Sequence, residues 1–154
     1  MLLKYWIWKL DPGNIYIFSK TSQLDLTYRP YIRWRKKKGV GLNMYSSVDM
    51  QIIEDIIEQQ KKIKQLNMAC DKHSRQELKR ILIIYDDVIG DEQLKSDKSQ
   101  LSTFSCMSRH SCITNIFLTQ NYTSIPSIIR RQTQLVFLMN MDNYSEIMAE
   151  ENSL

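Results

Sequence analysis

The chain has 154 residues, of which 43% are hydrophobic and 25% are charged, and its formal net charge is +4 at pH 7. This length is enough for one domain with a hydrophobic core and small for two, and the composition is typical of a folded protein. With only 4 glycines and 3 prolines, flexible linkers, collagen-like repeats and proline-rich stalks are excluded. The mild basic charge is compatible with nucleic-acid binding but does not require it.

Membrane insertion and secretion are not expected from the sequence. No segment approaches the roughly 20 uncharged apolar residues that a membrane-spanning helix needs, because Lys4 and Lys9 interrupt the apolar N-terminal stretch. No small-residue cleavage site follows that stretch. The 3 cysteines are odd in number and too few for a disulfide framework, which favours a reducing compartment.

The first strand is predicted over residues 14–21, where β-branched and aromatic residues follow the turn signal Asp11-Pro12-Gly13. The segment 2–10 is expected to be the end of a helix that this turn terminates.

A strongly basic segment, predicted to be a loop, covers residues 29–38 with Tyr31 and Trp34 interleaved among the cations. One interpretation is a phosphate-contacting loop whose rings stack on bases. The other is a solvated loop or edge that keeps the protein soluble by its charge. Composition does not separate the two. On the first interpretation the predicted nucleic-acid contacts are Arg33, Arg35, Lys36, Lys37 and Lys38.

The rest of the chain alternates between helix and strand. Ser46 or Ser47 is expected to cap the first helix, and Ser96 or Asp97 the second, which carries Leu101, Phe104 and Met107 as its apolar residues. The predicted helices cover residues 47–63, 97–108, 125–131 and 142–148, and the predicted strands cover residues 80–85, 113–120 and 134–140.

This alternation, with apolar strands, predicts an α/β domain with a mostly parallel sheet flanked by helices. In such sheets ligands bind outside the carboxyl ends of the strands. Three strands end in polar residues, at 19–21, 86–87 and 119–120. We therefore expect these polar ends to project from one edge of the sheet and to form the functional site.

Three side chains at this edge are candidates for phosphate chemistry. Asp86 ends a buried strand, where a carboxylate is able to hold Mg²⁺ through the waters of the ion. Asp87 is suited to polarise an attacking water as a general base, and the amide of Gln120 to bond a terminal phosphate. The alternative is that all three are solvated loop residues, since a short apolar run followed by two acids is common.

Cations and cysteines supply further candidates. Arg109 and Arg130 are suited to stabilise charge on a transferring phosphoryl group, and the alternative is that each is a surface cation at a helix end. Zinc is a weaker possibility, because the spacing of its potential ligands matches no familiar zinc module. Those ligands are Cys70, His73, Cys106, His110 and Cys112.

Two segments, ILIIYDDVIG and SRHSCITNIFLTQNYTSIPSIIRRQTQLVFL, carry several motifs in order. These are a strand with paired acids, an Arg-His before the next strand, a Thr-Gln strand ending and an Ile-Pro-x-x-Ile-Arg motif. In these features the chain, from about residue 14 to about residue 144, resembles the genome-packaging ATPases of poxviruses and other large DNA viruses. Those proteins belong to the FtsK/HerA group of P-loop ATPases, and the paired acids resemble their Walker B motif.

The resemblance implies an ATP-driven motor that moves double-stranded DNA into a capsid as a ring of identical subunits. ATP and Mg²⁺ are the implied cofactors, capsid or portal proteins the implied partners, and the host cytoplasm or the virion the implied location. By analogy Asp86 binds Mg²⁺ through water, Asp87 activates water and Gln120 senses the γ-phosphate. Arg109 or Arg130 is the implied arginine finger.

The sequence departs from this family pattern in one respect. A P-loop of the form GxxxxGK followed by Ser or Thr is absent, since the only glycines are Gly13, Gly39, Gly41 and Gly90. Without that backbone nest and its lysine the phosphates lack their main binding loop. We therefore expect residues 1–154 to be one ATPase-like domain of the RecA/ASCE type, incomplete at both ends and without the P-loop strand.

Three hypotheses follow for this polypeptide. The first is a packaging ATPase present as a fragment, with no appreciable ATP turnover of its own. The second is a non-catalytic module, derived from a P-loop ATPase, that binds DNA or a partner. The third is a nuclease that uses Asp86, Asp87 and Asp91 around Mg²⁺ and cleaves DNA without ATP.

Overall fold

The computed structural model of the chain describes residues 14–21, 28–39, 42–69, 78, 80–88 and 99–135. The helices predicted over 2–10 and 142–148 lie outside these ranges. So does the strand predicted over 134–140, except for residues 134 and 135, which are not in a strand.

The centre of the fold is a four-stranded sheet in which all neighbouring strands are parallel. Its strand order is β2-β1-β3-β4. The prediction of an α/β domain with a parallel sheet is therefore confirmed. The strands are β1 (Asn14–Ser19), β2 (Leu42–Tyr45), β3 (Ile81–Asp86) and β4 (Ile113–Leu118).

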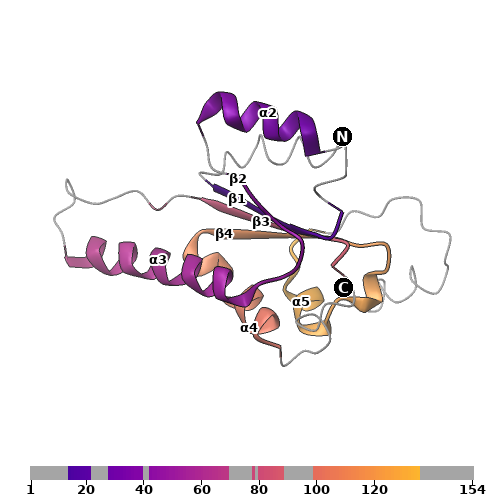
Figure 1. The fold of residues 1–154 in the computed structure, drawn as a ribbon. Helices are drawn as coiled ribbons and strands as arrows, with labels where there is room; N and C mark the ends of the chain where they lie inside the picture. Colours follow the sequence, from indigo (N-terminus) through magenta and orange to yellow (C-terminus); the bar gives the residue numbers. More distant parts are fainter. Residues whose placement is uncertain are drawn as a thin grey trace.

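Helices cover both faces of the sheet (Figure 1). Helix α2 (Arg29–Lys38) lies on one side, and α3 (Met50–Ala69) lies on the other with α4 (Gln100–Met107) and α5 (Ser127–Gln132). This explains why the first five residues of β3 are all buried, as expected for a central parallel strand. Leu82 and Ile84 pack in the core cluster on the α2 side, and Ile83 packs in the cluster on the other side.

The basic segment 29–38 is a helix, α2, and the prediction of a loop was wrong. Pro30 is tolerated because it lies in the first turn, where its missing N–H has no partner to lose. Gly39 ends the helix in the left-handed conformation, at φ 64°, and its N–H bonds the carbonyl of Arg35. Tyr28 and Ile32 anchor the helix on the apolar sheet face.

Helix α3 corresponds to the helix predicted over residues 47–63, but it begins later than expected, at Met50. Strand β2, which the sequence analysis missed, occupies residues 42–45. The Oδ1 atom of Asp49, rather than a serine hydroxyl of Ser46 or Ser47, accepts the N–H of Gln51 at 2.9 Å. Ile53 and Ile56 are buried against the sheet.

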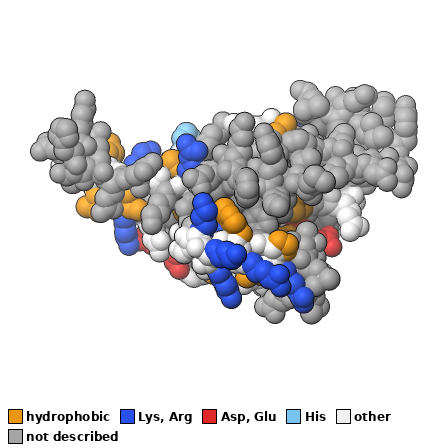
Figure 2. All heavy atoms as spheres, turned by 90° about the horizontal axis from the view of Figure 1, so that it is seen from above, with side chains coloured by type: hydrophobic (Ala, Val, Ile, Leu, Met, Phe, Trp, Pro, Cys, Tyr) orange, Lys and Arg blue, Asp and Glu red, His pale blue; other side chains and the backbone are white. Residues whose placement is uncertain are grey.

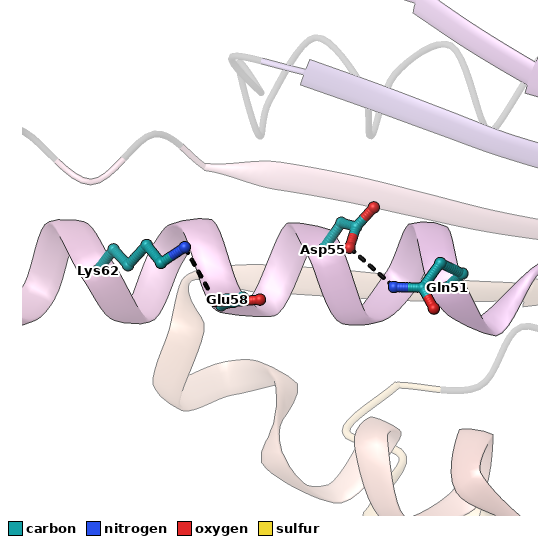
Figure 3. A network of polar contacts seen from close by, with 4 residues as sticks. All are labelled: Gln51, Asp55, Glu58 and Lys62. Atoms are coloured by element: carbon teal, nitrogen blue, oxygen red, sulfur yellow. Dashed lines mark hydrogen bonds and ion pairs between the residues drawn. The ribbon is translucent and has the colours of Figure 1, made fainter.

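The opposite face of α3 is exposed and carries side-chain pairs one helical turn apart (Figure 3). The amide nitrogen of Gln51 donates to Asp55 at 3.0 Å. Lys62 forms an ion pair with Glu58 at 2.9 Å, and this partner raises the pKa of Lys62. Such exposed pairs contribute little to stability, because water and salt screen their charges.

Two shorter helices complete the α3 side of the sheet. Helix α4 (Gln100–Met107) is capped by Ser99, whose hydroxyl accepts the N–H of Ser102 at 3.1 Å; Ser96 and Asp97, the predicted caps, lie outside the described residues. Leu101 and Phe104 are buried as predicted, whereas the Met107 side chain is 48% exposed. The remaining elements are η4 (Ser108–Ser111), η5 (Tyr122–Ser124) and α5 (Ser127–Gln132), which follows Pro126. No helix in the described part of the chain is both long enough and apolar enough to cross a membrane.

Candidate functional site

The predicted polar strand ends meet at one edge of the sheet. Ser19 pairs in register with Asp86, and Asp86 pairs with Leu118, at the carboxyl ends of β1, β3 and β4. The backbone N–H of Asp87 extends the ladder by bonding the carbonyl of Leu118 at 3.1 Å. We call this edge, residues 19–21, 86–87 and 118–120, the strand-end rim.

The carboxylate of Asp86 is fixed by two hydroxyl groups. Its Oδ2 atom accepts hydrogen bonds from Ser19 at 3.2 Å and from Tyr28 at 2.6 Å. The Ser19 hydroxyl in turn accepts the backbone N–H of Thr21 at 3.3 Å. The Oδ1 atom of Asp86 has no hydrogen-bond partner among the described residues, and the side chain is half-buried. Among the residues that the structure describes, one oxygen is thus held in place and the other is left for a ligand.

Asp87 differs from its neighbour in backbone and exposure. It has a φ of 48°, in the left-handed region that Asp tolerates better than most residues, and its side chain is exposed. The two consecutive acids thus lie in different environments: Asp86 is half-buried and Asp87 is exposed to solvent.

Gln120 follows β4 in a loop held by its neighbours' polar groups. The Thr119 hydroxyl donates to the Asn121 carbonyl at 2.9 Å, and the Ser124 hydroxyl donates to the same carbonyl at 2.6 Å. Gln120 takes no part in these bonds and is exposed. Gln120 therefore lies exposed in the loop that follows β4, the strand next to that of Asp86.

The two arginines proposed for charge stabilisation lie in different settings. Arg130 is half-buried on α5; its Nε donates to the Ile125 carbonyl at 3.0 Å, and its guanidinium carbon lies 5.3 Å from the centre of the Tyr122 ring. Arg130 is thus attached to the loop that follows Gln120. Arg109 lies in η4, and its side chain lies outside what the structure describes.

A row of stacked aromatic rings lies one residue before the rim, and the sequence analysis missed it. Tyr45, Phe18, Tyr85 and Phe117, one from each strand, stack in that order at centroid distances of 5.4, 5.6 and 4.6 Å. Burial raises the pKa of Tyr85, and its hydroxyl has no hydrogen-bond partner among the residues described. The signal available in the sequence was an aromatic residue directly before Ser19 and Asp86.

Helix α2 presents a basic surface on the face seen from above (Figure 2). Arg35 does not join that surface: its side chain is 1% exposed, with its guanidinium carbon 5.9 Å from the Trp34 ring centre. Lys38 also lies over the Trp34 ring, at 5.7 Å, so cations already contact the ring that was expected to stack on bases. The side chain of Tyr31 lies outside the description. The exposed cations, which we call the basic surface, are Arg29, Arg33, Lys36, Lys37 and Lys38.

The donor set at the rim fits Mg²⁺. This ion is bound through one or two carboxylates and keeps several waters. The rim supplies a carboxylate beside hydroxyl groups, with one oxygen that no described residue bonds, and this is suitable. No cluster of three or more His, Cys, Asp or Glu side chains occurs among the described residues, Cys106, His110 and Cys112 included. The triphosphate of ATP fits less well, because the sequence contains no GxxxxGK loop.

Comparisons with known proteins agree with the motifs of the sequence. A search of curated proteins finds no match, and a search of solved structures finds none either. The family model described as "Poxvirus A32 protein" matches residues 14–154, which include all four strands and the strand-end rim. The chain therefore belongs to the poxvirus A32 protein family, a family of genome-packaging ATPases.

Proposed function

We propose that this chain binds the magnesium ion and activates the attacking water in an ATPase that drives double-stranded viral DNA into a capsid. The family gives the class of activity. The observation that carries the proposal is the Asp86 carboxylate at the end of β3. Its Oδ2 atom is held by Ser19 and Tyr28, and its Oδ1 atom has no hydrogen-bond partner in the part of the chain that the structure describes.

The rim residues divide the chemistry among them. Asp86, as the Walker B carboxylate, holds Mg²⁺ through the waters of the ion; Mg²⁺, when bound, neutralises charge on the phosphates. Asp87, exposed beside it, is the general base toward water. Gln120, on the adjacent strand end, donates its amide N–H to the terminal phosphate.

An arginine completes the charge stabilisation, as in other phosphoryl-transfer enzymes. For Arg130 the Nε bond to Ile125 leaves its two terminal nitrogens available to a phosphate. Arg109, in η4, is the other candidate. With either arginine, the proposal includes a ring of identical subunits. In this ring the arginine of one subunit reaches the nucleotide of its neighbour. Capsid or portal proteins as partners, and the viral factory or virion as location, belong to the same proposal.

DNA contact is proposed for the basic surface of α2. Five exposed cations within ten residues, with no acidic residue among them, provide charge that neutralises phosphates and releases counterions. The contact does not depend on sequence, because no base-reading pattern is evident, which suits a motor that moves any stretch of its genome.

A second candidate function is a non-catalytic DNA- or partner-binding module. The absence of a GxxxxGK loop from the sequence favours it, because a binding module does not need ATP. The basic surface that would bind DNA is present whether or not ATP is bound. The two functions share the DNA contact and differ at Asp86.

Parallel assays of ATP turnover and Mn²⁺ binding, with Mn²⁺ replacing Mg²⁺, separate these functions. We expect Mn²⁺ binding that Asp86→Asn abolishes, with no appreciable ATP turnover by this polypeptide. Mn²⁺ binding that is unchanged in Asp86→Asn would refute the proposed function and leave the non-catalytic module. Robust ATP hydrolysis that Asp86→Ala abolishes would show that the expected inactivity is wrong. DNA cleavage without ATP would instead support a nuclease.

A further inference from the structure

Tyr28 joins the basic helix to the predicted metal site. It directly precedes α2, and its side chain is only 4% exposed, packed with Ile15 and Leu82 on the sheet. Its hydroxyl nevertheless reaches the rim and donates to Oδ2 of Asp86 at 2.6 Å. The ring of Tyr28 thus packs in the core, while its hydroxyl bonds Asp86, which is 58 residues away in the sequence.

The Tyr28–Asp86 bond has the geometry of a strong hydrogen bond. A hydroxyl bonded to a carboxylate at about 2.5–2.7 Å is charge-assisted and roughly twice as strong as a neutral pair. Ser19 bonds the same oxygen at a longer distance, 3.2 Å, from within the sheet. Ser19 is part of β1, whereas Tyr28 is the N-cap residue of α2, so among the described residues the Tyr28 bond is the one that connects Asp86 to a helix.

We propose that Tyr28 is a positioning residue for Asp86, and that it couples metal binding at Asp86 to the docking of α2 on the sheet. The inference rests on the proposed function, because it takes Asp86 to be the carboxylate that holds Mg²⁺ through the waters of the ion. Loss of a hydrogen-bonding partner in the outer shell of a metal site typically lowers metal affinity by about 10- to 100-fold. Coupling between two sites is reciprocal, so a metal that prefers the oriented carboxylate also stabilises the docked position of α2.

This coupling gives the basic surface a connection to the site of hydrolysis. The cations of α2 lie on the same rigid helix whose first turn adjoins Tyr28. A DNA duplex that shifts α2 changes the bond to Asp86, and loss of the metal loosens the helix that holds the DNA. The docking of α2 on the sheet and the orientation of the Asp86 carboxylate therefore change together.

The test is hydrogen–deuterium exchange of the full chain with and without Mg²⁺ at matched ionic strength, alongside Mn²⁺ binding by electron paramagnetic resonance. Tyr28→Phe removes only the hydroxyl bonded to Asp86. Tyr85→Phe is the matched control, because it removes a buried hydroxyl that has no partner among the described residues. In the wild type and the control we expect Mg²⁺ to slow exchange in peptides covering α2 but not α3. In Tyr28→Phe we expect about 10-fold weaker Mn²⁺ binding and no Mg²⁺-dependent slowing.

The outcomes distinguish the inference from the proposed function. Unchanged Mn²⁺ binding in Asp86→Asn would refute the proposed function. Mn²⁺ binding that is lost in Asp86→Asn but retained at wild-type affinity in Tyr28→Phe would overturn only the role of Tyr28. The wild-type measurement tests the coupling even if Tyr28→Phe fails to fold. If the wild-type chain binds Mn²⁺ but hydrogen–deuterium exchange in α2 is the same with and without Mg²⁺, the coupling is overturned.

Discussion

The hydroxyl of Ser19 donates to Oδ2 of Asp86 at 3.2 Å, at the last register position that β1 and β3 share. This contact shows how the pairing of the strands builds the candidate site. A shift of one residue in register would move Ser19 away from Asp86 and turn the alternate residues of β1 to the opposite face. The apolar pattern that fixes the register therefore also fixes the site.

Removing the Ser19 hydroxyl tests this contact. Ser19→Ala deletes a buried group that donates to a carboxylate and accepts the Thr21 N–H. We expect the free energy of unfolding in urea to fall by about 1.5–3 kcal/mol, because hydrogen bonds to charged groups contribute about that much. The exposed Ser47 provides the control: Ser47→Ala should change the value by less than about 0.5 kcal/mol. Equal effects of the two variants would contradict the assigned contact.

Charge on α2 governs the predicted DNA affinity. Replacing the three exposed lysines at 36–38 with glutamine should weaken binding to a short duplex, measured by fluorescence anisotropy. The slope of log K against log salt should become shallower by up to about 3, since each phosphate contact contributes about 0.9.

The matched control replaces three exposed lysines of α3, at positions 61, 62 and 64, with glutamine. It removes the same charge from the opposite side of the sheet, so it should leave the affinity and the salt slope nearly unchanged. Similar losses in both triple variants would show that net charge, rather than the basic surface, attracts the DNA.

Arg35 should matter for folding more than for DNA binding. Its side chain is 1% exposed and packs beside Trp34, so Arg35→Ala removes buried packing as well as charge. We expect a loss of about 2 kcal/mol in the free energy of unfolding, against less than about 0.5 kcal/mol for Arg33→Ala on the exposed face. If Arg35→Ala left stability unchanged while weakening DNA binding as much as Arg33→Ala, Arg35 would belong to the surface after all.

The Tyr85 hydroxyl should reduce stability, most of all at alkaline pH. Burial raises the pKa of Tyr85 above its ordinary value of about 10, so near that pH the unfolded chain loses a proton that the folded chain keeps. The stability present below pH 10 is therefore lost as the pH rises above it. Tyr85→Phe should be more stable by about 1 kcal/mol at pH 7, because it removes an unsatisfied buried hydroxyl, and its advantage should grow above pH 10. A clear loss of stability at pH 7 would show that the hydroxyl has a partner.

Periodicity predicted the elements whose burial follows a regular pattern. The apolar run of β3, the helix α3 and the polar residues that follow β1 and β4 all lie where they were expected, apart from the later start of α3. Parallel pairing then follows from the alternation of strand and helix. The shared edge of Ser19 and Asp86 was a consequence of that topology.

Three features could not be predicted because they depend on tertiary contacts: the helix α2, the strand β2 and the bond from Tyr28 to Asp86. Six cations hide the helical pattern of α2, although Tyr28, Ile32 and Arg35 recur at helical spacing and are the residues turned toward the sheet. Strand β2 has only four residues, all half-buried, so it lacks a distinctive pattern. The bond from Tyr28 to Asp86 spans 58 residues and has no local signal at all.

Line broadening of amide signals by Mn²⁺ in a ¹⁵N-labelled chain tests the central claim most directly. That claim is that the strand-end rim is a cation site organised by Asp86. We predict that signals from residues 19–21, 86–88 and 119–121 broaden before those of the exposed acids of α3, Glu54, Asp55 and Glu58, and that Asp86→Asn removes this preference. Broadening that begins on α3, or that is the same in Asp86→Asn, would contradict the claim.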